Sequence, residues 1–235
     1  MQRTQVVPRE QWLEARLALL AKEKELTRQR DRLAAERRRL PWVKIEKSYA
    51  FEGPDGRETL GDLFAGRRQL IVYHFMLGPG WEEGCKSCSF WADSYQGSVV
   101  HLAARDAALV AISRAPWKEI EAFRVRMGWI FPWLSSHGSD FNFDFGVSFK
   151  PEDPESDAPN YNFGTLRFGG EEAPGLSVFA RGEDGALYHT YSTYARGLDA
   201  LNGTYQLLDL CPHGRGEDGL DYPMAWVRHH DRYDR

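Results

Sequence analysis

The stretch from Gln69 to Cys88 limits the possible folds more than any other part of this chain of 235 residues. Residues 69–77 (QLIVYHFML) form a near-continuous run of apolar, β-branched and aromatic residues, as expected of a central strand buried on both faces. The run ends at GPG (78–80), and GCKSC (84–88) follows at the predicted start of a helix. The order therefore predicts a buried strand, a loop, and a helix that opens on two cysteines.

Helices and strands continue to alternate after this stretch. Cys85 to about Ala104 is typical of a helix, Ala107 to Ser113 of a second buried strand, and Trp117 to Met127 of another helix. Right-handed crossovers between such strands give a parallel sheet with helices on its faces. The alternation therefore predicts an α/β domain.

The C-terminal third begins with a hairpin signal. Leu176 to Arg181 and Ala186 to Tyr191 are strand-like and flank a turn at 182–185 that starts and ends with glycine. Residues 197–210 then predict a closing helix with Gly203 inside it. The sheet is therefore expected to end in antiparallel strands.

The N-terminal region predicts one long helix. Arg9 to Leu40 is rich in Ala, Leu, Glu, Lys and Arg and contains no Gly or Pro, while Pro8 suits a first helical turn and Pro41 stops the helix. At ~1.5 Å per residue such a helix extends about 45–50 Å, which is more than a helix packed on a small core needs. We therefore expect an arm.

Leucines form a thin apolar stripe along this arm, with a break near Thr27. The stripe consists of Leu13, Leu17, Leu20, Leu26, Leu33 and Leu40. Its narrowness is closer to a coiled-coil seam than to a wide core face, so a homodimer through this helix is one expectation. A helix folded back on its own domain is the alternative.

The sequence thus divides into two parts. We expect an N-terminal helical arm at 1–41 and a domain at 42–235, in which the acidic, Pro-rich stretch at about 150–160 forms a surface loop. The domain would open with a strand at 43–51, followed by a turn at 53–56.

Charge is unevenly distributed, although the net charge is −4. Residues 1–40 carry 11 Lys or Arg and 6 Asp or Glu, whereas residues 41–235 carry 19 and 28. An acidic domain argues against a general nucleic-acid surface, because affinity for phosphates needs clustered cations. No run approaches the ~18 apolar residues of a membrane span, and the N-terminus lacks the apolar core of a secretory signal. We expect a cytoplasmic protein that binds neither nucleic acid nor membrane.

Cys85 and Cys88 are the candidate catalytic residues. Cysteines three residues apart in a first helical turn face the same way and lie close enough for a disulfide. The helix start stabilises the Cys85 thiolate and Lys86 would lower its pKa further, whereas Glu82 and Glu83 oppose this. We expect a moderately activated Cys85 as the nucleophile and a shielded Cys88 as the resolving thiol.

Several segments resemble a known family. The order strand, loop, Cys-x-x-Cys, helix, strand, helix, hairpin, helix is that of the thioredoxin fold, and TLGDLFAGRRQLIVYHFM resembles its beginning in the peroxiredoxin and thioredoxin superfamily. A closer resemblance, to a bacterial thioredoxin-like family of unknown function described as predicted dithiol-disulfide oxidoreductases, is carried by GPGWEEGCKSCSFWAD, HLAARDAALVAISRAPWKEIEAFRVRMGWIFPW, GSDFNFDFGVSF and YHTYSTYARGLDALNGTYQLLDL. The resemblance spans nearly the whole chain. It implies a thioredoxin-like α/β fold, with a mixed central sheet flanked by helices and a long N-terminal helix, and thiol-disulfide chemistry.

The site departs from the superfamily's usual motifs. Thioredoxins typically have Trp-Cys-Gly-Pro-Cys, whereas Trp81 here stands four residues before Cys85, so a thioredoxin-like potential does not follow. Thioredoxin-fold enzymes place a cis-proline just before the first hairpin strand, and Pro174 is the positional match. The peroxiredoxin signature has Pro and Thr or Ser seven and three residues before its cysteine, where this chain has Gly78 and Glu82. A dedicated peroxidase is therefore the weaker interpretation.

A zinc site is a competing interpretation of the cysteines. Cys85 and Cys88 with Cys211 and His213 would supply four ligands. Zinc ribbons, however, usually place their pairs on loops and knuckles rather than after a buried strand. We therefore expect no metal and an isolated thiol at Cys211.

Other residues have two interpretations each. His74 is expected to be a core histidine, with a position facing the active site as the alternative. Phe90 and Trp91 are candidates for the wall of a substrate groove, and FNFDFGVSF is expected to be packing and hairpin material. The terminal WVRHHDRY is a docking tail or, by default, a solvated end.

These features predict a thiol-disulfide oxidoreductase. Cys85 and Cys88 are the expected catalytic pair, and Trp81, Lys86 and Pro174 are the candidate substrate-binding residues. The substrate would be a disulfide-containing protein or a small-molecule disulfide, an external thiol donor would restore the enzyme, and no cofactor would be needed. The alternatives are a thiol-dependent peroxide reductase, and a dimeric redox-sensing or interaction protein without turnover.

Overall fold

The computed structural model describes residues 5–150 and 160–234, so the predicted acidic loop at 150–160 lies almost wholly outside the described residues. The chain divides into two compact units, Met1–Pro41 and Trp42–Arg235. Within the described part of the chain, no helix is both long enough and apolar enough to cross a membrane.

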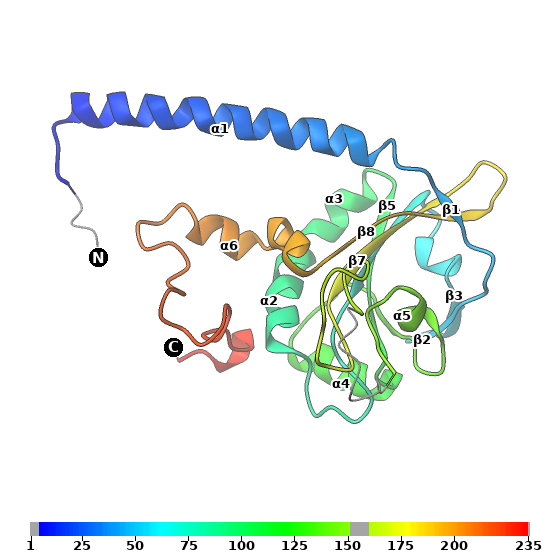
Figure 1. Ribbon diagram of the computed structural model, residues 1–235. Coiled ribbons are helices and arrows are strands. Elements are labelled where there is room, and N and C mark those ends of the chain that lie inside the picture. Colours follow the sequence, from blue (N-terminus) through cyan, green and yellow to red (C-terminus); the bar gives the residue numbers. More distant parts are fainter. Residues whose placement is uncertain (1–4, 151–159, 235) are drawn as a thin grey trace. The chain divides into compact units, whose positions relative to one another are not determined.

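The first unit is the helix α1, Arg9–Arg37 (Figure 1). It starts after Pro8, as predicted, and ends three residues before Leu40. No residue of α1 is buried, and its apolar side chains do not gather on one face. At 100° per residue, Leu26 projects from the side opposite Leu13, so the predicted stripe changes sides at its break.

The second unit is built on one sheet of eight strands among the described residues, in the order β1-β8-β7-β4-β5-β6-β2-β3. Its strands are β1 Val43–Lys44, β2 Ala50–Gly53, β3 Gly56–Thr59, β4 Gln69–His74, β5 Ala107–Ser113, β6 Trp133–Ser135, β7 Gly175–Arg181 and β8 Leu187–Tyr194. The predicted central strand, second buried strand and hairpin correspond to β4, β5 and the pair β7 and β8.

The middle of the sheet carries the thioredoxin-like fold. Strand β4 pairs parallel with β5 and antiparallel with β7, which pairs antiparallel with β8. The helices connecting or following these strands are α2 Lys86–Tyr95, α3 Val99–Ala103, α4 Trp117–Arg126 and α6 Gly203–Leu208. Figure 1 shows them beside the mixed sheet. The predicted fold class is confirmed.

Alternate side chains of β4 enter different cores, as the period of a strand requires. Tyr73 belongs to a cluster on one face, with Phe123 of α4 and Trp91 of α2. Leu70 and Val72 belong to a second cluster, which also contains aromatic residues from three other segments: Phe64, Phe141, Phe145 and Phe179. The cysteines lie on the first of these faces.

The predicted strand at 43–51 is wrong, because the structure divides it into β1 and β2. These strands lie six strand spacings apart in the sheet, about 29 Å if the sheet were flat. Residues 44–50 extend over at most about 22 Å. The sheet therefore curls, and Tyr49, in the connection between the two strands, is buried in the second core.

Short elements account for most of the other differences from the predictions. The sequence signals missed β6 and the helix α5, Phe141–Asp144. This helix lies in FNFDFGVSF, whose Phe141 and Phe145 pack in the second core, as expected of packing material. The long helix predicted from Cys85 is divided into α2, the 3-10 turn η2 (Gln96–Ser98) and α3.

The predicted closing helix is also interrupted. A 3-10 segment, η3 (Ala195–Leu201), precedes α6, and Gly203 is the first residue of α6 rather than an interior one. The Asn202 side chain accepts a hydrogen bond from the Tyr205 N–H, 3.0 Å away, which caps the new helix.

Candidate active site

Gly84 brings the chain close to the aromatic core just before the cysteines. A Cβ atom at Gly84 would lie 2.6 Å from the Phe75 ring and 2.7 Å from the Phe123 ring, so only glycine fits. The Cys85 N–H donates to the Met76 carbonyl at 3.0 Å. This contact fixes the first cysteine beside the end of β4.

Cys85 directly precedes α2, and its carbonyl accepts the Ser89 N–H at 2.9 Å and the Ser89 hydroxyl at 3.0 Å. Its side chain is half-buried, whereas Cys88, one turn later, is 1% exposed. The structure thus presents one reachable thiol and one shielded thiol.

The environment makes the two thiols chemically unequal. Hydrogen bonding from Cys88 to Cys85, assisted by Ser87 and opposed by burial, lowers the pKa of Cys85 to about 6. Burial, and then the neighbouring Cys85, raise the pKa of Cys88. At neutral pH Cys85 is therefore a thiolate and Cys88 a protonated thiol, which is the direction that the sequence predicted.

Lys86 is not among the groups with the largest effect on the pKa of Cys85. Its Nζ donates to the Ala225 carbonyl at 3.1 Å and lies 5.8 Å from the centre of the Tyr222 ring. The groups with the largest effect on the pKa of Cys85 are Cys88 and Ser87. The ammonium group instead holds the C-terminal part of the chain against the start of α2.

Glu83 does not oppose the thiolate as predicted, because its charge is compensated. Its carboxylate accepts from Arg126 at 2.8 Å and from Arg232 at 2.7 Å. The hydrogen bond from Arg126 is the main cause that lowers the pKa of Glu83.

The C-terminal segment is not the solvated end that the sequence suggested by default. Residues 217–232, named here the C-terminal strap, include the fully buried Val227 and His229, which is 4% exposed. The His229 Nε2 donates to the Gly84 carbonyl at 2.8 Å. The 3-10 turn η4, His230–Arg232, adds an ion pair between Asp231 and Arg126 at 2.9 Å. The strap therefore covers the segment that carries Cys85.

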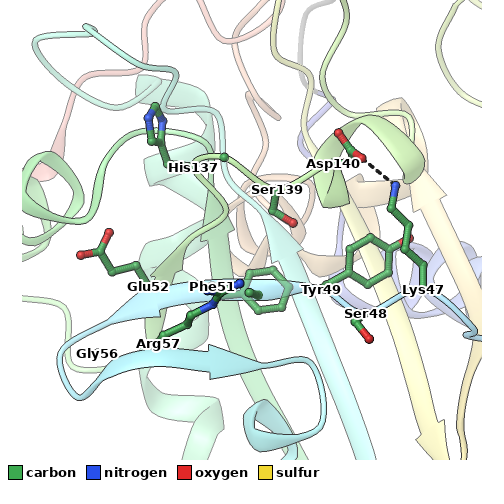
Figure 2. A pocket seen from close by; sticks show the side chains of 12 residues that line it. Lys47, Ser48, Tyr49, Phe51, Glu52, Gly56, Arg57, His137, Ser139 and Asp140 are labelled. Atoms are coloured by element: carbon green, nitrogen blue, oxygen red, sulfur yellow. Dashed lines mark hydrogen bonds and ion pairs between the residues drawn. The ribbon is translucent and has the colours of Figure 1, made fainter.

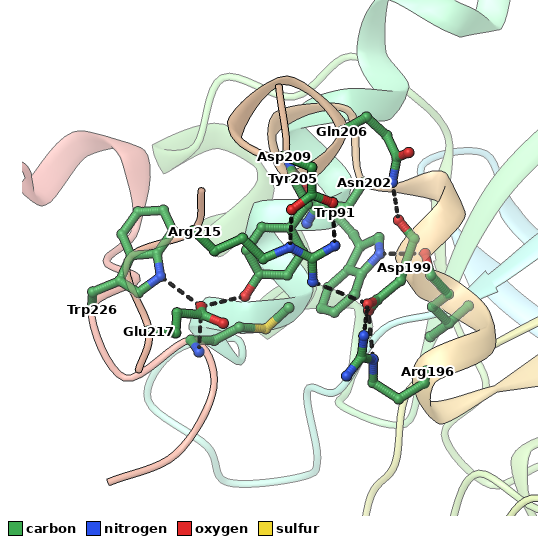
Figure 3. A network of polar contacts seen from close by, with 12 residues as sticks. Trp91, Arg196, Asp199, Asn202, Tyr205, Gln206, Asp209, Arg215, Glu217 and Trp226 are labelled. Atoms are coloured by element: carbon green, nitrogen blue, oxygen red, sulfur yellow. Dashed lines mark hydrogen bonds and ion pairs between the residues drawn. The ribbon is translucent and has the colours of Figure 1, made fainter. Parts of the chain in front are cut away.

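A cavity of about 530 Å³ lies beside Cys85. Most of its lining is apolar or aromatic, and includes Met76, Trp91, Phe168, Leu198, Tyr222 and Met224. Charged side chains form one part of the wall (Figure 3). Strap residues complete the wall, and no sequence pattern predicted their part in it, whereas Trp91 and Pro174 were predicted and do line the cavity.

The predicted binding residues are only partly brought together. Pro174 lines the cavity, but its peptide bond is trans, because the described residues contain no cis peptide; its carbonyl accepts the Tyr161 hydroxyl. Trp81 does not line the cavity, and its ring instead lies against Gly78. Lys86 does not line it either.

Phe90 and Trp91, predicted as groove residues, are both buried. Trp91 lines the cavity and donates from Nε1 to the Leu198 carbonyl at 2.8 Å. Phe90 packs edge-on against Tyr205 and Trp226, which supports the cavity wall from behind.

The residues of the alternative zinc site do not form a cluster. Within residues 5–150 and 160–234, no group of three or more His, Cys, Asp or Glu side chains could hold a metal ion. Cys211 is exposed, and its thiol lies 3.6 Å from the Leu207 carbonyl.

His74 is a core histidine, as expected, on the face of the sheet away from the cysteines. Its ring packs against Phe141 and Phe145 of the second core, and its Nε2 lies 2.8 Å from the Ser177 hydroxyl. Burial, with the nearby His189, lowers its pKa to about 3. It is therefore neutral and does not serve Cys85.

Another hollow of about 530 Å³ lies between β2 and residues 137–140 (Figure 2). Its lining is polar and includes Arg57 and His137. Lys47, also in the lining, pairs with Asp140 at 2.8 Å and with Asp144 at 2.7 Å. Neither Cys85 nor Cys88 lines this hollow, so we assign it no chemistry.

A comparison with protein families agrees with the sequence resemblance. A family profile described as a bacterial protein of unknown function, DUF899, matches residues 1–233. The chain belongs to the DUF899 family. No curated protein matches this DUF899 chain.

Solved structures similar to this DUF899 chain are peroxiredoxins of low identity. The peroxidoxin BcpB of Mycobacterium tuberculosis is 14% identical with a TM-score of 0.48, and the match covers 72% of this chain and 97% of that one. A PrxQ mutant of Xylella fastidiosa is 13% identical with a TM-score of 0.45, covering 71% and 95%. The mitochondrial 2-Cys peroxiredoxin of Plasmodium falciparum is 10% identical with a TM-score of 0.43, covering 71% and 92%.

Proposed function

We propose that this protein is a thiol-disulfide oxidoreductase in which Cys85 attacks and Cys88 resolves. The observation that carries the proposal is the inequality of the two thiols. Cys85 is half-buried with a pKa lowered to about 6, whereas Cys88 is shielded and its pKa is raised. A dithiol catalyst needs this combination of a reachable thiolate and a protected partner.

The reaction proceeds in two exchanges. The Cys85 thiolate attacks one sulfur of a disulfide R–S–S–R, so that a Cys85–S–S–R bond forms and RS⁻ leaves. Cys88 loses its proton and attacks the Cys85 sulfur, which releases the second RS⁻ and forms the Cys85–Cys88 disulfide. The substrate gains two electrons, and the departing thiolates take up two protons.

Return to the reduced state requires an external thiol donor, either one dithiol or two monothiols, which is oxidised to a disulfide. A cytoplasmic thiol pool would supply it, and no metal or organic cofactor enters the cycle. Peroxide reduction is the nearest alternative, because the same Cys85 thiolate would become a sulfenic acid that Cys88 resolves.

Trapping in a Cys211→Ser background tests the proposal, because this change removes the exposed third thiol. With bis(2-hydroxyethyl) disulfide, Cys88→Ser should accumulate one mercaptoethanol adduct on Cys85, measured by mass spectrometry. The matched variant Cys85→Ser should accumulate none within the same time, because Cys88 is buried and protonated.

Three results would contradict the proposal. Equal trapping by both variants would reverse or abolish the assigned order. Consumption of hydrogen peroxide by the wild-type protein, with no adduct on either variant, would favour the peroxide reductase. Inactivity with every disulfide and peroxide would favour a redox sensor without turnover.

A further inference from the structure

From the half-open cavity beside Cys85, to whose wall the C-terminal strap contributes, we infer that the substrate is a low-molecular-weight disulfide carrying a neutral, apolar or aromatic group. This inference rests on the proposed thiol-disulfide function and adds the class of substrate to it. The cavity volume of about 530 Å³ falls in the range of small-molecule sites, roughly 300–1,000 Å³.

The inner wall is apolar. Trp91, Leu198 and Tyr205 are buried at its base, where packing holds them, and Met76, Phe168 and Pro174 are only partly buried and present apolar surface to the cavity. The Trp91 indole is held by its bond to the Leu198 carbonyl. An aromatic ring in this space therefore gains burial.

The charged side chains of the wall already have partners (Figure 3). Arg215 binds Asp209 at 2.8 Å and Asp199 at 3.1 Å, and Arg196 binds Asp199 at 2.7 Å. The Arg215 guanidinium also stacks 3.8 Å from the centre of the Tyr205 ring. The two arginines and two acidic residues of the lining balance one another, so the wall has no excess positive charge to attract an anion such as glutathione disulfide and favours a neutral molecule.

Glu217 fixes the strap residue that faces the cavity. Its Oε1 accepts from the Tyr205 hydroxyl at 2.6 Å, from the Trp226 Nε1 at 2.8 Å and from the Met224 N–H at 2.9 Å. Burial would raise the pKa of Glu217, but these donors lower it, so the carboxylate is charged. Met224 has φ = +68°, an unfavourable conformation for a long side chain that this hydrogen bonding helps to maintain.

Ala195, which lines the cavity but does not belong to the strap, is also held by a hydrogen bond in a strained backbone conformation. Its φ is +48°, and its N–H donates to the Tyr161 hydroxyl at 2.9 Å. Backbone strain of this kind persists where surrounding contacts impose it, and it concentrates at binding sites. Both strained residues line the cavity beside Cys85.

The position of the strap beside Cys85 also argues against a protein substrate. Tyr222, Pro223 and Met224 of the strap form part of the wall, and Cys85 is only half-exposed beside them. Attack needs the thiolate in line with the S–S bond, so a polypeptide disulfide has to bring its sulfurs to Cys85 beside these strap residues, which favours a small substrate over a bulky one. A small disulfide enters with its apolar group in the cavity and its sulfurs at Cys85.

The chemistry is that of the proposed function with the substituents assigned. The bond between Cys85 and the sulfur of the apolar half forms as the thiolate of the other half leaves, and Cys88 then releases the apolar thiol. Dithiothreitol, as the external dithiol, restores the reduced pair and supplies the electrons in the assay.

A matched pair of substrates tests the inference on the full-length protein. Benzyl 2-hydroxyethyl disulfide and bis(2-hydroxyethyl) disulfide share a leaving group and differ in one aromatic substituent. We expect kcat/KM to be at least about tenfold higher for the benzyl compound, since even small apolar groups change such constants by this factor in a fitted pocket. Insulin, as a protein disulfide, should be the slowest substrate.

Variants locate the preference in the cavity. Met224→Gln keeps the side-chain length and the backbone N–H that binds Glu217, but it places a polar amide in the cavity. The ratio of the two kcat/KM values should therefore fall toward one. Met224→Leu should keep the ratio. The control Leu207→Gln changes an apolar residue of α6 that is 68% exposed and does not line the cavity, and it should also keep the ratio.

The outcomes separate this inference from the proposed function. Equal kcat/KM values for the two small disulfides, a higher value for insulin, or an unchanged ratio in Met224→Gln would overturn the inference while disulfide turnover stands. No turnover of any disulfide by the wild-type protein would overturn the proposed function, and the inference with it.

Discussion

Helix α1 and the C-terminal strap are both rich in charged residues, and they differ in what their residues contact. The ion pairs described for α1, such as Arg16 with Glu23 and Arg32 with Glu25, join residues of the same helix at 2.8 Å. The strap's ion pairs reach other elements: Asp231 contacts Arg126 of α4 at 2.9 Å. Exposed pairs within a helix contribute little to stability, whereas the strap's pairs accompany buried apolar contacts.

The difference shows that a charged segment contributes to the stability of the fold when it also buries side chains. No residue of α1 is buried, whereas the strap buries Val227 completely and His229 almost completely. His229 binds the backbone of Gly84, so the strap acts on the residue that precedes the nucleophile. We therefore expect changes in the strap to affect both stability and the thiol, and matched changes in α1 to affect neither.

The largest expected effect is on the free energy of unfolding, when an apolar residue is changed to Asp in the strap and, for comparison, in α1. Val227→Asp buries a carboxylate without a partner and should lower the free energy of unfolding by about 3 kcal/mol or more. Leu26→Asp, on the half-exposed side of α1, should lower it by less than about 1 kcal/mol. Urea unfolding at low protein concentration, where any self-association is suppressed, measures both.

A loss in Leu26→Asp as large as that in Val227→Asp would break the comparison, because α1 would then contribute a buried position. The exposed position Val100 on α3, changed to Asp, provides the reference for a solvent-facing site of the domain.

The intermediate effect concerns the pKa of Cys85. The thiolate is the reactive form, so the rate of iodoacetamide alkylation should rise with pH and reach half of its plateau near pH 6. Ser87→Ala removes the side-chain donor to the thiolate, while the backbone N–H remains, and should raise the midpoint measurably. Lys86→Gln should move it by less than about 0.3 unit, because the ammonium faces the Ala225 carbonyl of the strap.

If Lys86→Gln shifts the alkylation midpoint as much as Ser87→Ala does, the Lys86 charge stabilises the Cys85 thiolate directly, as the sequence suggested. Mass spectrometry in the Cys211→Ser background assigns the modified site. The protein is first reduced with dithiothreitol, which is removed just before alkylation, so that both thiols start reduced.

The lowered pKa also connects Cys85 to stability. Its folded-state pKa lies below the ordinary value of about 8.5, so its stabilising contribution is fully present above that value. The contribution is lost as the pH falls through about 6. The free energy of unfolding of the reduced wild-type protein, relative to Cys85→Ser, should therefore increase from pH 5 to pH 9.

The parts of the fold that the sequence predicted are those with local signals. Strands β4 and β5 are continuous apolar runs, and β7 and β8 flank a glycine-containing turn, so each is recognisable without its neighbours. Strand β6 has three residues and α5 has four, which is too short for any period to appear. The separation of β1 from β2 depends on the curl of the sheet, a property of all eight strands.

The candidate site divides along the same line. Cys85 and Cys88 were predictable, because two cysteines at the start of a helix are a local motif. The cavity was not, because Met224 and Leu198 meet Cys85 only after the chain has folded, from more than 100 residues away. Lys86 was predicted to act on the thiolate of Cys85, its neighbour in sequence, whereas its hydrogen-bond partner in the structure is the Ala225 carbonyl.

The smallest expected effect on the site is that of removing the arm. Deletion of residues 1–40 leaves every strand of the sheet, because β1 begins at Val43. Turnover of bis(2-hydroxyethyl) disulfide and the alkylation midpoint of Cys85 should stay within about twofold and about 0.3 unit of the full-length values, since no residue of α1 is buried.

Sedimentation of the same deletion variant tests the predicted homodimer separately. Leu13, Leu17 and Leu20 lie on one side of α1, and Leu26 and Leu33 lie on the opposite side, so a partner helix would have to contact the two halves on different sides. If the arm joins two copies, the mass at micromolar concentration should fall from two chains to one on deletion, and Leu26→Asp should weaken the dimer as well. An unchanged mass would contradict the predicted homodimer and remove the arm from the interface between two copies.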